Sequence, residues 1–97
     1  MIQKNIELNQ FIEEIIDIIT HNDNDYYYNK TEFDTCCTNI GKKIHSIGGY
    51  KALIQVSNIV IDTLKEKEYN YTYLQQLSEM EYTWSEISIE YKTLFYN

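Results

Sequence analysis

Apolar and polar residues follow one another along most of the chain with the period of an α-helix. In residues 3–20, Ile12, Ile15, Ile16 and Ile19 keep the i, i+3, i+4, i+7 spacing that places side chains on one helix face. An adjoining apolar stripe widens this face, as in a helix that is central in its domain or contacts a partner. Isoleucine also favours strands, but the stretch is long and lacks strict alternation. We therefore predict a helix over 3–20.

Two further helices are predicted near 30–47 and 50–67, separated by the pair Gly48-Gly49. The pair is typical of a left-handed helix C-cap. Gly41 lies inside the first of these helices, where glycine costs about 1 kcal/mol relative to alanine. We expect another helix to approach closely at that point. The expected inward positions are Phe33, Cys36 or Cys37, Ile40, Ile44 and Ile47 in the first helix, and Leu53, Val56, Val60 and Leu64 in the second.

The clearest periodicity predicts a fourth helix near 72–96. Its main stripe consists of Leu74, Leu77, Met80, Trp84, Ile87, Tyr91 and Leu94. Four amphipathic helices joined by short or medium connectors indicate an all-α fold, a small bundle of about four mostly antiparallel helices. We expect residues 1–97 to form a single helical domain, with a radius of gyration of about 13 Å.

Composition excludes several classes of protein. The 97 residues are 43% hydrophobic and contain no proline, which is too apolar for intrinsic disorder, and no apolar run has the ~20 residues of a membrane span. Isoleucine occurs 15 times and tyrosine 10 times, whereas alanine occurs once and arginine is absent. The enriched residues share AT-rich codons, so an AT-rich genome is the simplest cause. A cluster of tyrosine or asparagine is therefore only weak evidence for a functional site.

The net charge of −7 is unevenly distributed. Residues 1–35 carry −6, residues 36–67 carry +3 and residues 68–97 carry −4. The acidic balance disfavours nucleic-acid binding, because phosphate contacts need clustered cations. For the basic middle we expect attraction to the acidic faces of neighbouring helices rather than a binding patch.

The two cysteines, Cys36 and Cys37, are adjacent, which is the wrong geometry for a disulfide within a helix. His21 and His45 stand at no metal-ligand spacing from them. Acidic residues interrupt the N-terminal apolar stretch, so no signal peptide is indicated and a cytoplasmic protein with reduced thiols is expected. We predict neither a metal nor a cofactor. A metal or redox site at the cysteine pair would require exposed thiols.

Catalytic and calcium-binding motifs are missing from the sequence. Asp23, Asp25 and Glu32 can be aligned to three ligand positions of an EF-hand loop, but His21 then replaces the first acidic ligand and Tyr26 the essential glycine. No nucleophile elbow or zincin motif occurs. We therefore expect a protein that is not an enzyme and predict no catalytic residues.

Two features suggest binding. Tyrosines flank the first and third connectors, which an up-down bundle brings to one end, and tyrosine is enriched in interfaces; the candidate interface is Tyr26, Tyr27, Tyr28, Tyr69, Tyr71 and Tyr73. At the other end, glycine amides and lysines form a weaker candidate anion site: Lys42, Lys43, Gly48, Gly49 and Lys51.

The leading hypothesis is a protein–protein interaction or self-association module, with a protein partner or a homo-oligomer and no membrane or nucleic acid. The alternative is a bundle that binds a small ligand or anion, at this end or in the interior near Gly41, Cys36 and Cys37.

Overall fold

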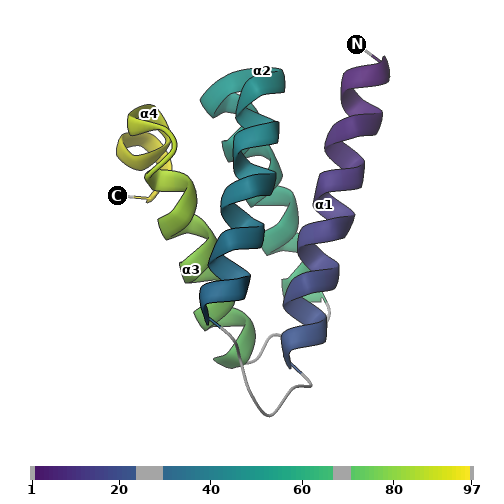
Figure 1. Ribbon diagram of the computed structural model, residues 1–97. Coiled ribbons are helices and arrows are strands. Elements are labelled where there is room, and N and C mark those ends of the chain that lie inside the picture. Colours follow the sequence, from purple (N-terminus) through teal and green to yellow (C-terminus); the bar gives the residue numbers. More distant parts are fainter. Residues whose placement is uncertain (1, 24–29, 67–70, 97) are drawn as a thin grey trace.

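The protein folds into helices that stand side by side (Figure 1). The computed structural model describes residues 2–23, 30–66 and 71–96, with side chains from Leu8 to Thr20, Lys30 to Glu66 and Leu74 to Phe95. Every element in these ranges is helical, which confirms the all-α prediction. The elements are α1 (Ile2–Asp23), α2 (Lys30–Glu66), α3 (Tyr71–Ser85), α4 (Ile89–Tyr91) and the π-helix η1 (Lys92–Tyr96).

The chain runs up and down the bundle. From α1 it reverses into the first half of α2, reverses again within α2, and returns through α3 (Figure 1). The helices pack as a compact bundle with contacts of α2 to both α1 and α3. The radius of gyration is 12.7 Å, in line with the expected value. Among the described residues, no helix is long and apolar enough to cross a membrane.

The kink in α2 lies at Gly49. Its φ of 69° and ψ of −159° are non-helical, so the helices predicted over 30–47 and 50–67 are the two halves of α2. The positive φ agrees with the expected turn, but the extended ψ puts Gly49 in a region open almost only to glycine rather than in the left-handed helical region. No atom lies within 4 Å of a Cβ built at Gly49. The backbone conformation therefore accounts for the glycine here, and not a lack of space.

The core confirms most of the predicted inward positions. Ile15 and Ile19 of α1 are fully buried, and Cys37 rather than Cys36 faces inward from α2. The wide apolar face of α1 is largely used within the bundle, because Phe11, Ile16 and Ile18 are partly buried against the core. The other fully buried apolar side chains include Ile44, Leu53, Val56, Val60, Leu64, Met80, Trp84 and Tyr91.

The helix predicted over 72–96 is interrupted. α3 ends at Ser85, and Ser88 caps α4 by accepting a hydrogen bond from the backbone N–H of Tyr91 on its Oγ, at 3.2 Å. The break changes which later residues face inward: Tyr91 is fully buried, whereas Leu94 is 66% exposed. Leu74, near the start of α3, is also exposed. The prediction of a continuous stripe that includes Leu74 and Leu94 is therefore wrong.

Candidate functional site

Gly41 of α2 is a point of close contact with α3 and the turn that follows it. A Cβ at this position would lie 2.5 Å from Cδ1 and Nε1 of Trp84 and 2.7 Å from Cδ1 of Ile87. Trp84 is fully buried, and its Nε1–H donates a 2.8 Å hydrogen bond to the carbonyl oxygen of Cys37. The expected close approach at Gly41 is confirmed. The indole fills the space beside Gly41 that the interior ligand site would need.

The cysteine pair consists of free thiols, Cys36 half-buried and Cys37 buried. Burial raises the pKa of the Cys37 thiol far above its ordinary value, and the nearby Asp34 carboxylate raises it further. Because the thiolate is the form that attacks electrophiles and binds metals, Cys37 is poorly suited to either role. No group of three or more His, Cys, Asp and Glu side chains that could hold a metal occurs among the described residues.

A pair of buried hydroxyls joins α2 to α4. The Oγ of Ser57 and the phenol oxygen of Tyr91 are 2.8 Å apart and share a hydrogen bond. The Tyr91 ring meets Trp84 edge-on, with centroids 6.1 Å apart, and stacks on Phe95 at 5.1 Å. Burial raises the pKa of the Tyr91 phenol. A nucleophilic serine needs a hydrogen-bonded base, and the partner of Ser57 is a protonated phenol, so we interpret this pair as an anchor for α4.

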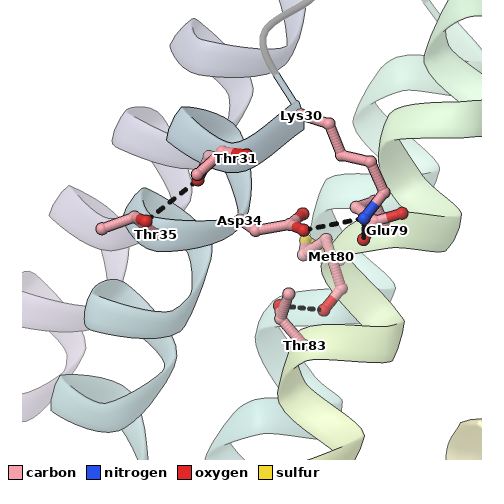
Figure 2. A network of polar contacts seen from close by, with 7 residues as sticks. All are labelled: Lys30, Thr31, Asp34, Thr35, Glu79, Met80 and Thr83. Carbon is pink, nitrogen blue, oxygen red and sulfur yellow. Dashed lines mark hydrogen bonds and ion pairs between the residues drawn. The ribbon is translucent and has the colours of Figure 1, made fainter.

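Charged side chains link the beginning of α2 to α3 (Figure 2). The Nζ atom of Lys30 lies 3.1 Å from Oδ2 of Asp34 and 3.1 Å from Oε2 of Glu79. Hydrogen bonds to Asp34 and Glu79 raise the pKa of the Lys30 ammonium. The other carboxylate oxygen of Asp34, Oδ1, is buried without a hydrogen-bond partner. The Lys30 ammonium therefore has two carboxylate partners, whereas the Asp34 carboxylate has a hydrogen-bond partner at only one of its two oxygens.

A cleft of about 490 Å³ lies between α2 and α3, next to this network. We call it the α2–α3 cleft. Lys42 and Glu86, on its two walls, are exposed and form no ion pair. Its lining residues are Asp34, Thr38 and Lys42 from α2, and Tyr82, Thr83, Glu86 and Ile87 from α3 and the turn that follows. Cavities of this size are typical of small-molecule sites.

The candidate anion site falls on the kink of α2. Lys42, Lys43 and Lys51 are exposed on either side of it, and Gly48 precedes Gly49 at the bend. Lys42 also lines the α2–α3 cleft. None of these lysines is in an ion pair, and neither is Lys65. We expected the basic residues 36–67 to attract neighbouring acidic helices, but these four lysines form no direct ion pair. Anion binding at this end stays a prediction.

The candidate tyrosine interface lies mostly outside the described residues. Tyr26, Tyr27, Tyr28 and Tyr69 fall in the undescribed segments, and Tyr71 and Tyr73 belong to the beginning of α3, where the side chains are not described. The described helix ends next to these segments, the end of α1 and the beginning of α3 among them, lie at one end of the bundle (Figure 1). The gathering of the six tyrosines there stays a prediction.

Two exposed aliphatic side chains escaped the sequence analysis. Ile89 is 74% exposed and Leu94 is 66% exposed, on the short C-terminal segment that Tyr91 anchors. The sequence signal for their exposure is the Ser88 cap, which starts a new helix and resets the periodicity. The α2–α3 cleft was also missed, because its two walls come from residues at least 40 positions apart.

Comparisons with protein-family models, curated proteins and solved structures found no match for the chain. Its function is therefore inferred from the residues described above.

Proposed function

We propose that the chain is a protein-interaction module whose partner is a second copy of itself. The observation that carries this proposal is the exposure of Ile89 and Leu94 on a segment that is held firmly to the bundle. Tyr91 fixes this segment through Ser57, and the Ser88 cap fixes its beginning. Fully burying an isoleucine or leucine side chain contributes about 1.5–3 kcal/mol. A partner that covers both would gain up to that amount at each side chain, without first having to order the segment.

Charge complementarity favours a second copy as the partner. The kink of α2 and α4 lie at the same end of the molecule (Figure 1), and the exposed, unpaired Lys43 and Lys51 stand on either side of that kink in α2. On α1, Glu13 and Glu14 are exposed and likewise form no ion pair. Because each copy carries both the basic end and the acidic face, two copies related by a two-fold axis can satisfy both contacts at once. Such charges orient the partners more than they add affinity.

The proposal includes no catalysis and places the protein in the cytoplasm. The buried Cys37 thiol and the Ser57–Tyr91 pair both lack the activation that a nucleophile requires. Free thiols at Cys36 and Cys37 suit a reducing compartment.

Size-exclusion chromatography with light scattering, over a wide range of protein concentration, tests the self-association. We expect a dimer that the double variant Ile89→Asp/Leu94→Asp converts to a monomer. Leu74→Asp is the matched control, because Leu74 is also an exposed leucine but lies near the beginning of α3; it should leave the dimer intact. A wild-type chain that is monomeric at every concentration would show the proposal to be wrong.

A charge exchange tests the complementarity separately. The variants Lys43→Glu/Lys51→Glu and Glu13→Lys/Glu14→Lys should each dimerise more weakly than the wild type, because each places like charges opposite one another. Mixed in equal amounts they should form a heterodimer, since the acidic kink of one then meets the basic α1 of the other. If the mixture associates no better than either variant alone, the basic end and the acidic face do not meet.

A further inference from the structure

The α2–α3 cleft holds charged groups that the fold does not use. Lys42 and Glu86 line it and neither is in an ion pair. Asp34 also lines it; its Oδ2 is paired with Lys30 at 3.1 Å, and its Oδ1 is buried without a hydrogen-bond partner. Unpaired charges next to one another in a cleft of about 490 Å³ are a pattern expected of a small-molecule site, where a few polar groups orient the ligand.

The order of these groups along the cleft follows from the register of the two helices. Asp34, Thr38 and Lys42 are spaced by four and form one stripe on α2, with Asp34 and Lys42 about 12 Å apart along the axis at 1.5 Å per residue. The Lys30–Glu79 ion pair places the beginning of α2 next to the middle of α3 (Figure 2). Further along both helices, Gly41 is next to Ile87. Glu86 is therefore at the Lys42 end of the cleft, and Asp34 is at the other end.

This order of charged groups along the cleft is complementary to a ligand that carries three charges. One end of the cleft offers the Lys42 ammonium and the Glu86 carboxylate, and the other offers the Asp34 carboxylate, whose Oδ2 is paired with Lys30; Ile87 and Tyr82 also line the cleft. We propose that the α2–α3 cleft binds a free basic amino acid of the lysine type. Lys42 binds the α-carboxylate, Glu86 binds the α-ammonium, and Asp34 accepts the side-chain ammonium. The three protein groups sum to −2 + 1 = −1, and the ligand carries +1.

The Lys30 ion pair is the contact that the ligand must share or displace. The Lys30 side chain is 63% exposed, and surface ion pairs of this kind are weak and exchangeable. The incoming ammonium can therefore take a place on Oδ2 of Asp34 without opening the core, where Trp84 fills the space beside Gly41. The methylene chain covers Ile87, which is only partly buried.

The first experiment titrates the full chain with three probes by isothermal calorimetry and backbone-amide NMR. L-lysine should bind and shift the amide signals of residues around the cleft. Norleucine, which lacks the side-chain ammonium, and cadaverine, which lacks the carboxylate, should each bind about tenfold more weakly, since each loses one charge-assisted contact. If lysine does not bind, or if either analogue binds equally well, the proposal is overturned.

Variants then identify the site. Lys42→Gln and Glu86→Gln change exposed residues and should leave the fold intact, and each should weaken lysine binding about tenfold. Lys65→Gln is the matched control, because it removes another exposed lysine of α2, which does not line the cleft; it should bind lysine as the wild type does. Equal binding by all three variants would overturn the assignment. Self-association does not enter into this test, since its variants involve other residues.

Discussion

At the scale of single residues, the contact between Gly41 and Trp84 decides how α2 meets α3. The indole lies where a Cβ would be, and its Nε1–H reaches the Cys37 carbonyl oxygen across the same contact. A carbonyl inside a helix already accepts one hydrogen bond and has a second lone pair to offer. The missing side chain at Gly41 thus lets the only tryptophan of the chain lie against the backbone of α2 and satisfy its N–H while fully buried.

Gly41→Ala should lower the free energy of unfolding by about 1–2 kcal/mol. Overpacking against the buried indole costs about 1–3 kcal/mol, of which the better helix propensity of alanine returns up to about 1 kcal/mol. Urea unfolding followed by circular dichroism and by Trp84 fluorescence measures the change. Asn39→Ala, at an exposed position of the same helix, is the control and should be neutral or slightly stabilising. An unchanged or higher stability for Gly41→Ala would mean that the indole moves away at no cost.

Glu81 gives a prediction about pH. The side chain is half-buried, and burial raises its pKa above the ordinary value of 4.5. The folded protein therefore holds this proton more tightly than the unfolded chain does. The resulting stabilisation is complete below about pH 4.5 and is lost as the pH rises through the folded-state pKa.

Glu81→Gln removes the cost of burying this charge. The variant should be more stable than the wild type at pH 7, and the difference should shrink and vanish as the pH falls toward 4. Thermal unfolding at several pH values measures it, with Glu13→Gln as the matched exposed control. A gain of the same size at every pH would show that the effect comes from something other than titration of Glu81.

At the scale of elements, the bundle ends in two short helical pieces instead of one long helix. α4 has three residues and η1 has five, too few for either to be stable without tertiary contacts. Their stability must come from packing, to which Tyr91 contributes directly: it contacts Trp84 and Phe95 and shares a hydrogen bond with Ser57 of α2. One tyrosine thus holds in place the segment that exposes Ile89 and Leu94.

A double-mutant cycle on Ser57 and Tyr91 measures that attachment. Tyr91→Phe leaves the Ser57 hydroxyl buried without its partner, which should cost about 1–3 kcal/mol, and Ser57→Ala leaves the phenol in the same state. The double variant should cost less than the sum of the two, because no unpaired hydroxyl remains, with a coupling of about 0.5–3 kcal/mol. Additive losses would mean that the two hydroxyls do not interact in solution.

Helix positions could be predicted from the sequence because they depend on local periodicity. The close approach at Gly41 could be predicted too, because a glycine inside a helix lowers helix stability and close packing against another helix can compensate for that cost. The break at residues 86–88 could not, because it contains no glycine or proline and Ser88 is the only local signal. The α2–α3 cleft lay beyond sequence analysis for a different reason: which α3 residues face Lys42 depends on the register of two helices, and packing around Trp84 sets that register.

At the scale of the whole molecule, the net charge is −7, and few of the lysines in the part of the chain that the structure describes pair with an acid. Lys30 pairs with Asp34 and Glu79, whereas Lys42, Lys43, Lys51 and Lys65 pair with no acid. The acidic groups therefore repel one another at long range more than nearby cations attract them. Repulsion of this kind destabilises the compact state and is screened by salt.

Salt should therefore stabilise the fold. When NaCl rises from about 0.01 M to about 0.15 M, the Debye length falls from about 30 Å to about 8 Å, and the free energy of unfolding in urea should increase. The measurement is made at protein concentrations below any association, so that dimer formation does not contribute. The variant Glu13→Gln/Glu14→Gln, with a net charge of −7 + 2 = −5, should gain less from the same salt because it has less repulsion to screen. A fall in stability with salt would instead mean that the Lys30 ion pairs affect the free energy of unfolding more than the long-range repulsion does. The unpaired lysines would then affect the binding of a partner and not the stability of the fold.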